Sequence, residues 1–290
     1  MKIKFKLLLA VAVLAVFIAV DWGLAHSKLI ADSNIFIKND FEITQHDHPE
    51  KVWDKVFFGN SVVISAYTES ESSSGYINCG LDYGVVTDLW EMIDEGYINI
   101  GSELVIGLNY LTLYDDFETN PTYIWHKKIY EPYVYFERDR FYPLITGTFE
   151  RLLSGENIMP MTYSQQNKAI YHGRVSDEAL KDKLKEYETA FFNKPISDYS
   201  ENLDALENVI KYCKKNNIRV RGVHMPWNPE FKKPELVIQV HNEANKVFEK
   251  YNIDVLDLED EFAKEYFYDT GHLNYDVGSK AFTKRIDEWL

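Results

Sequence analysis

The chain of 290 residues is 46% hydrophobic and carries a formal net charge of −15. Its length and apolar fraction are those of a globular protein with one sizeable core, which excludes a disordered chain. The acidic balance disfavours nucleic acid as a partner, because a negative body repels a phosphate backbone. Two cysteines are too few for a disulfide scaffold.

Residues 1–25 predict a segment that enters a membrane. Lys2, Lys4 and Lys6 precede the apolar run LLLAVAVLAVFIAV, and apolar residues resume after Asp21. Basic residues before such a run place the N-terminus in the cytoplasm and the remainder across the membrane. We expect an uncleaved signal anchor, with a signal peptide cut after Ala25 as the alternative. Beyond this segment the chain has 28 basic and 45 acidic residues, a net charge of −17.

After an exported linker at residues 26–50, apolar runs alternate with helical patterns. Strands are expected at residues 56–58, 76–79, 103–108, 218–224 and 253–258. Helices are expected at residues 85–96, 176–192, 201–215 and 234–251, with a short helical segment at 259–267 and a last helix that ends at 290. This alternation predicts a three-layer α/β domain over residues 51–290, with a central parallel sheet between helices. An aromatic-rich insertion at about 113–166 interrupts the pattern, and Cys213 is expected to pack in the core.

Polar residues and glycines follow the predicted strands. Ser61 comes after the first strand, Gly80 and Gly84 after the second, and Asn109 after the third. Ligands of parallel sheets bind beyond the carboxyl ends of the strands, so these residues are expected at one edge. A loop with an aspartate and a histidine, at 269–272, follows the fifth strand and can reach the same edge.

Four segments resemble the conserved blocks of the SGNH/GDSL hydrolase superfamily, and they occur in that family's order: FFGNSVVISAY (57–67), NCGLDYGVVTDL (78–89), LVIGLNYLTL (104–113) and DTGHLNYDVG (269–278). The resemblance implies a flavodoxin-like three-layer fold and a serine esterase or acyltransferase. The chain departs from the family pattern at Asn60, where an aspartate is usual, and at Tyr110, where an aspartate often follows the asparagine. The second block also has one extra residue between Asn78 and Gly84.

The residue types at these positions fit a serine nucleophile. A serine hydroxyl needs a base within hydrogen-bond reach and a group that orients that base. Ser61 is the predicted nucleophile, His272 the base and Asp269 the orienting carboxylate. Structural alternatives remain open: Ser61 could cap a helix, and His272 could lie on the surface at a helix start.

An oxyanion formed during attack on an ester also needs hydrogen-bond donors. The predicted donors are the backbone N–H groups of Ser61 and Gly84 and the side-chain amide of Asn109, with Gly80 as the alternative to Gly84. Asn109 could instead be a turn residue. The chain has neither a phosphate-binding glycine loop nor a zinc-binding motif, so we expect no metal and no organic cofactor.

The insertion offers candidate substrate-binding rings. Trp125 and Tyr133 could stack on sugars, and His224 at a strand end could line the substrate site. The alternative is a segment that packs these rings on its own core.

An exported, anchored member of this superfamily resembles the alginate O-acetyltransferase-like and teichoic acid D-alanylation protein-like proteins of the bacterial envelope. The resemblance implies acyl transfer to an envelope glycan outside the cytoplasmic membrane, beside a multispanning membrane acyltransferase as partner. A carbohydrate acetylesterase with the same catalytic residues is the alternative enzyme. A non-catalytic polymer-binding or scaffold subunit is the alternative outside enzymes.

Overall fold

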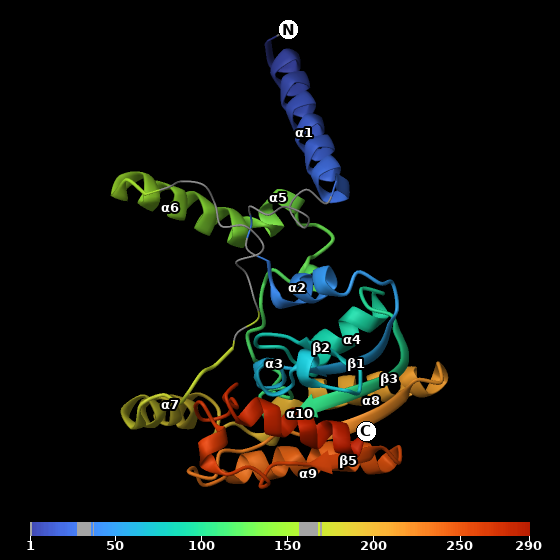
Figure 1. The fold of residues 1–290 in the computed structure, drawn as a ribbon. Helices are drawn as coiled ribbons and strands as arrows, with labels where there is room; N and C mark the ends of the chain where they lie inside the picture. Colours follow the sequence, from blue (N-terminus) through green and yellow to red (C-terminus); the bar gives the residue numbers. More distant parts are fainter. Residues whose placement is uncertain (1, 28–35, 37, 157–167, 169) are drawn as a thin grey trace. The chain divides into compact units, whose positions relative to one another are not determined.

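The computed structural model describes residues 2–27, 36, 38–156, 168 and 170–290. The chain divides into two compact units. One, which we call the anchor unit, comprises Met1–Ile43 and Pro121–Asn167, and the other, the sheet unit, comprises Thr44–Asn120 and Lys168–Leu290. Figure 1 shows the elements of each.

The sheet unit is built on five parallel strands in the order β2-β1-β3-β4-β5. Their bounds are Trp53–Gly59 (β1), Ile77–Gly80 (β2), Ile100–Leu108 (β3), Arg219–His224 (β4) and Asp254–Asp257 (β5). Consecutive residues of β1, such as Val56, Phe57 and Phe58, are all buried because helices cover both faces. The predicted parallel sheet is confirmed.

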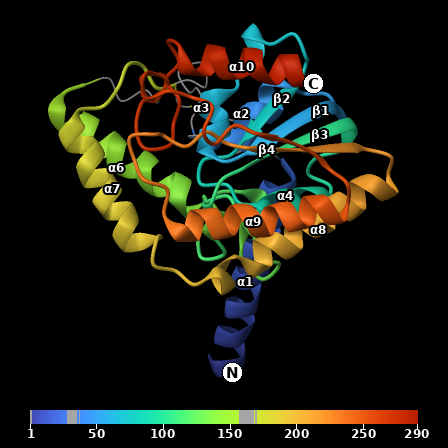
Figure 2. The same cartoon turned by 90° about the horizontal axis from the view of Figure 1, so that it is seen from below.

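Helices lie on the two faces of this sheet (Figure 2). One face carries α3 (Ser61–Ala66) and α10 (Gly278–Trp289), and the other carries α4 (Val86–Asp94), α8 (Ser200–Lys215) and α9 (Glu235–Lys250). The fold is therefore the three-layer α/β/α arrangement that the alternation predicted. A further helix, α7 (Asp177–Ala190), begins after Ser176, whose hydroxyl accepts a hydrogen bond from the Ala179 N–H.

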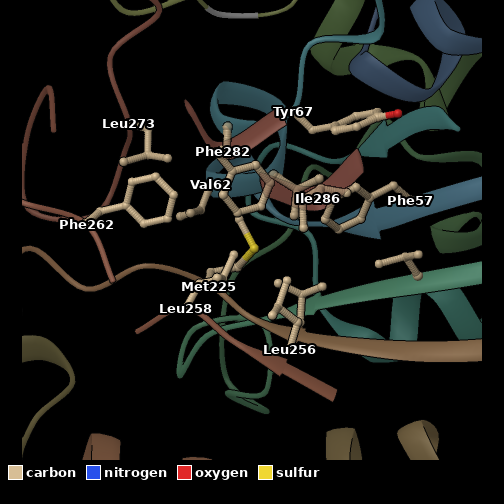
Figure 3. Close-up of a cluster of buried hydrophobic side chains, with 14 of the residues drawn as sticks. Phe57, Val62, Tyr67, Met225, Leu256, Leu258, Phe262, Leu273, Phe282 and Ile286 are labelled. Atoms are coloured by element: carbon tan, nitrogen blue, oxygen red, sulfur yellow. The ribbon is translucent and has the colours of Figure 1, made fainter. Parts of the chain in front are cut away.

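A buried apolar cluster joins α3 and α10 to the sheet (Figure 3). Phe57 of β1 and Phe282 of α10 stack with ring centroids 6.2 Å apart, and Ile286 lies fully buried beside them. On the opposite face, Cys213 of α8 is fully buried with a free thiol, as its place on the apolar face of that helix predicted. Cys79 is also buried.

The anchor unit contains α1 (Lys2–Ser27), α5 (Tyr133–Phe136) and α6 (Arg138–Ser154). The segment Ile3–Ser27 of α1 is long and apolar enough to cross a membrane, which is compatible with either a membrane anchor or a signal peptide. Helix α2 (Asp40–Asp47) lies within the residues predicted as a linker. The insertion thus has helical structure of its own, although residues 157–167 lie outside the described part.

One short element differs from its prediction. Residues 259–267 were expected to be helical, but only a 3-10 turn at Lys264–Tyr266 forms there. The Glu259 carbonyl instead accepts a hydrogen bond from the Trp227 N–H, and the Leu258 N–H donates to the carbonyl of His224. A helix over these residues would need the Glu259 carbonyl for its first intrahelical bond, so the bond from Trp227 takes an acceptor away from it.

Candidate active site

Ser61 stands at the carboxyl end of β1, where the strand turns directly into α3. The Asn60 side chain accepts a hydrogen bond from the Val62 N–H at 3.0 Å and so caps this helix. Gly59 permits the turn, because a Cβ on it would lie 2.2 Å from the Val63 side chain. The short connection presents the Ser61 hydroxyl at the sheet edge while the following residues are buried.

The core brings Ser61 together with a histidine 211 residues away in the chain. Val62, next to Ser61, and Leu273, next to His272, are both buried in the cluster of Figure 3. Burial of these two neighbours fixes the backbone on either side of the polar pair. The same apolar packing that joins α3 and α10 to the sheet therefore positions both functional side chains.

Ser61, His272 and Asp269 form a continuous hydrogen-bonded chain. The Ser61 Oγ lies 2.9 Å from the His272 Nε2, and the His272 Nδ1 lies 3.0 Å from both carboxylate oxygens of Asp269. These are hydrogen-bond distances for a nucleophile, its base and the group that orients the base. The structure thus joins the three side chains in the order that the sequence predicted.

The loop of Asp269 is held by its own hydrogen bonds. Its Oδ1 accepts from the N–H groups of Gly271 at 3.0 Å and His272 at 2.8 Å. The Asn228 side chain donates to the Asp269 carbonyl at 2.9 Å. The Asp269 carboxylate is almost fully buried, and its orientation toward the imidazole is fixed from several directions.

A lysine from α7 also contacts this carboxylate. The Lys183 ammonium forms an ion pair with Asp269 Oδ2, on the side opposite its local backbone partners. Burial alone would raise the pKa of Asp269, but the hydrogen bond and charge of His272 and the charge of Lys183 outweigh burial and hold that pKa well below its usual range. Asp269 is therefore a stable carboxylate partner for the imidazole.

Helix capping in this segment falls to another residue. The Asn274 Oδ1 accepts from the N–H groups of Val277 at 3.0 Å and Gly278 at 3.1 Å, at the start of α10. Asp269 precedes that helix by nine residues and contacts the imidazole instead. Asp269 and His272 therefore do not form the start of a helix, which was the structural alternative for this segment.

Asn109 is oriented by a pair of hydrogen bonds with Asn60. The Asn60 Nδ2 donates to the Asn109 Oδ1 at 3.1 Å, and the Asn109 Nδ2 lies 3.5 Å from the Asn60 Oδ1. The Asn109 Oδ1 also accepts from the Thr112 N–H at 2.9 Å. These bonds hold the Asn109 side chain in place, and Asn109 and Ser61 line the same cavity.

The glycine donors predicted after β2 need correction. The Gly84 N–H already donates to the Leu81 carbonyl at 3.0 Å, and the Gly80 N–H donates to the Asn78 Oδ1 at 3.0 Å. Both N–H groups already donate to nearby oxygen atoms, which the spacing of the glycines in the sequence could not show. The part of this loop that lines the cavity beside Ser61 is instead Asp82 and Tyr83.

A cavity of about 430 Å³ opens beside the Ser61 hydroxyl. Its walls are rich in aromatic rings from the loops and from α7: Tyr110, Phe117, Tyr171, Tyr187, Phe191, Phe192, Trp227 and Phe231. Asn109 and His272 also line it, and Lys183 contributes the cationic side chain. An apolar cavity with a few convergent polar groups is the usual form of a small-molecule or polymer-end site.

Two residues of the candidate site, Lys183 and Tyr171, were not predicted from the sequence. Lys183 lies on an exposed-looking helix with charges all around it, and nothing in its spacing marks it as a partner of Asp269. The Tyr171 ring lies against the His272 ring at an interplanar angle of 38°, with centroids 4.7 Å apart. Burial raises the pKa of the Tyr171 hydroxyl to about 12, with Asp82 and Asp269 adding to the effect. Both come from segments outside the recognised blocks.

The predicted substrate-binding rings of the insertion are packed inside the anchor unit. Trp125 stacks on Tyr123 with centroids 4.7 Å apart and contacts Phe41 edge-on at 5.0 Å. Tyr133 is also buried, with the Lys127 ammonium over its ring. Their packing matches the alternative in which these rings form a core of their own.

His224 is buried away from the large cavity. Its Nε2 lies 2.8 Å from the Asn245 Oδ1, and its ring stacks on His241 with centroids 3.8 Å apart. His224, His241 and Glu259 hold ligand atoms within 4.8 Å of one another. However, the two imidazole rings are stacked, so their in-plane lone pairs point in parallel directions and do not converge on one metal ion. The Lys233 ammonium also lies 2.8 Å from Glu259, where it already neutralises the carboxylate. We interpret this cluster as structural.

Comparison with known proteins adds little to this geometry. Neither a protein-family model nor a curated protein matches the chain. Among solved structures, an acetyl xylan esterase aligns with 12% identity and a TM-score of 0.42, covering 81% of this chain and 99% of that chain. At that similarity the alignment carries no argument about activity.

Proposed function

We propose that the sheet unit is a serine-dependent acyltransferase or esterase of the SGNH type. The observation that carries this proposal is the hydrogen bond of 2.9 Å between the Ser61 Oγ and the His272 Nε2, with Asp269 on the other imidazole nitrogen. A partly buried, fully connected Ser-His-Asp chain that lines a cavity has the parts that ester chemistry needs.

In the first half-reaction, the Ser61 oxygen attacks the carbonyl carbon of an ester as its proton moves to the His272 Nε2. The tetrahedral intermediate collapses when the bond to the leaving alcohol breaks. His272 donates its proton to that alcohol oxygen, and the acyl group remains on Ser61. Asp269 holds the imidazole so that Nδ1 keeps its proton and Nε2 can accept one.

In the second half-reaction, an acceptor hydroxyl gives its proton to His272 and attacks the acyl carbon. The bond to Ser61 breaks, and the serine oxygen recovers the proton from His272. Water as acceptor makes the protein an esterase, and a sugar hydroxyl makes it an O-acyltransferase. Both reactions use the same catalytic residues.

The negative charge of each intermediate requires hydrogen-bond donors. The Ser61 N–H, at the first position of α3, and the Asn109 Nδ2 are the donors proposed here, because the first belongs to the nucleophile itself and Asn109 lines the same cavity as Ser61. Losing one such donor typically costs about 3 kcal/mol of transition-state stabilisation. The pairing of Asn109 with Asn60 places this amide before the substrate arrives.

We further propose that the acceptor is a hydroxyl of a cell-envelope polysaccharide, outside the cytoplasmic membrane. Three features support it: the resemblance to extracytoplasmic O-acyltransferases, the apolar N-terminal helix, and the aromatic walls of the cavity, since flat rings stack on sugar faces. A carbohydrate acetylesterase is the second candidate, supported by the same cavity and triad.

A single assay separates these outcomes. The full chain in detergent receives an activated acetyl ester with and without an oligosaccharide acceptor, and the products are identified by mass spectrometry. Acetyl groups on the sugar that depend on Ser61 support acyl transfer. Rapid hydrolysis with unmodified sugar supports the esterase and rejects the transferase. Turnover that is unchanged in Ser61→Ala rejects both.

A further inference from the structure

The anchor unit carries an amphipathic helix whose apolar face is exposed. On α6, the residues Tyr142, Ile145, Phe149, Leu152 and Leu153 have between 54% and 86% of their surface accessible. At 3.6 residues per turn these side chains, with Phe141, fall within an arc of about 120°. Asp139, Glu150 and Ser154 lie outside this arc.

The position of α6 is tied to the end of the apolar N-terminal helix. The carboxylate of Asp21 on α1 accepts hydrogen bonds from the N–H groups of Tyr133 at 2.8 Å and Val134 at 3.0 Å, at the start of α5. Helix α6 begins two residues after α5 ends. Figure 1 shows α5 beside the C-terminal end of α1, with α6 leading away across the direction of α1.

The level of Asp21 on α1 marks a membrane boundary. Residues 7–20 form the uninterrupted apolar run, and Asp21 and the exposed Trp22 follow it directly. A tryptophan beside the first charged residue is typical of the headgroup region of a bilayer. Because α5 is bonded to Asp21, α6 starts at the same level.

The charge of this segment fits a lipid surface better than the rest of the chain does. Residues 121–156 contain five basic and five acidic residues, so they are neutral where the whole chain carries −15. Anionic headgroups therefore do not repel this part of the protein as they would the remainder. A polar face of mixed charge opposite an apolar arc is typical of helices that lie in a membrane interface.

From these observations we infer that the anchor unit binds the membrane through two elements: α1 is retained and spans the bilayer, and α6 lies flat in the interface with its apolar arc in the acyl region. The bonds of Asp21 support retention of α1, since cleavage after Ala25 would remove the acceptor of two N–H groups in α5. The inference does not depend on the catalytic proposal.

The test places an environment-sensitive fluorophore on single cysteines in the full chain, reconstituted in vesicles of phosphatidylcholine and phosphatidylglycerol. Ile145→Cys and Phe149→Cys report the apolar arc, and Glu150→Cys and Ser154→Cys are the matched controls on the polar face. The native Cys79 and Cys213 are buried, and the unsubstituted chain serves as the labelling blank.

The expected result is a face-dependent pattern. Labels at 145 and 149 should be quenched several-fold more strongly by lipids with a quencher high on the acyl chain than by aqueous iodide. Labels at 150 and 154 should be quenched more strongly by iodide than by these lipids. Equal access of iodide to both faces would place α6 in water and overturn the inference. Shielding of 145 and 149 from both quenchers would show a protein contact instead, which also overturns it.

Retention of α1 is read separately, from the protein as it is isolated from the membranes of the cells that express it, before any reconstitution. The intact mass of protein isolated from membranes should include residues 1–25. A mass that corresponds to cleavage after Ala25 would refute the two-element attachment, whatever the fate of the catalytic assay.

Discussion

The ammonium of Lys183 on α7 forms an ion pair with Asp269, the carboxylate that holds the imidazole of His272. A wall helix of the cavity is thereby connected to the proposed base through one charged contact. The titratable and charged groups around the imidazole are Asp269 on its own loop, Lys183 and Tyr187 on α7, Tyr171 tilted against the ring, and Asp82 in the facing loop. Of these, Lys183 is the group whose positive charge contacts Asp269.

Removal of the Lys183 charge should lower activity by loosening the Asp269 carboxylate. In Lys183→Met the Asp269 Oδ2 loses its ion pair, while Oδ1 keeps the N–H groups of Gly271 and His272. Because a less firmly held carboxylate orients the imidazole less well, kcat should fall on the order of tenfold. The measurement is kcat for the wild type and the variant. Lys183→Arg keeps the charge and should keep kcat, and equal kcat values for all three proteins would show that the lysine only packs.

Asp269→Asn should reduce kcat about 10³- to 10⁴-fold, because an amide does not stabilise the tautomer that leaves Nε2 free to accept a proton. The carboxamide oxygen can still accept from the Gly271 and His272 N–H groups, so the loop should keep its shape. Asp276→Asn is the matched control: that carboxylate pairs with the exposed His172 and should be dispensable. A loss of less than tenfold in Asp269→Asn would remove the aspartate from the mechanism.

Asn60→Ala should lower both activity and stability. The variant loses the oxygen that accepts from the Val62 N–H and the NH₂ group that donates to the Asn109 Oδ1. Loss of the helix cap should lower the free energy of unfolding by about 1 kcal/mol. Because the Asn109 amide is then no longer held by its partner, we expect kcat to fall about 10- to 100-fold. Full activity in the folded variant would show that the paired amides have no part in catalysis.

Leu273→Ala tests whether the core positions the base. Leu273 is fully buried in the cluster of Figure 3, so its truncation should lower the free energy of unfolding by about 2–5 kcal/mol. Because Leu273 adjoins His272, kcat should fall as well. Val277→Ala, on the exposed side of the same segment, should change the free energy of unfolding by less than about 0.5 kcal/mol. Urea denaturation in detergent measures the free energy of unfolding of the two variants. Equal losses in Leu273→Ala and Val277→Ala would contradict the role of the buried cluster in positioning His272.

Much of the sheet unit could be predicted from the sequence because its signals are local. Buried runs such as Val56 to Phe58 and the amphipathic helices between them indicate a parallel sheet, and the carboxyl-end rule then gathers Ser61, Asn109 and the loop of His272 at one edge.

What could not be predicted depends on long-range contacts or on which hydrogen bond a group makes. Lys183 is one charge among many on α7, and only the folded chain shows its contact with Asp269. Gly84 has the expected spacing, yet its N–H is used by Leu81. Trp125 and Tyr133 are residue types that often stack on sugars, but their rings are buried within the anchor unit.

The most direct test of the proposed nucleophile is intact-mass and peptide analysis after treatment with a fluorophosphonate. The folded wild type should gain one adduct, located on Ser61, and labelling should slow at least tenfold in His272→Ala. Ser65→Ala, which removes a hydroxyl bonded to the Val62 carbonyl in the same helix, should label like the wild type. An unlabelled folded protein, or an adduct that persists in Ser61→Ala, would contradict the account.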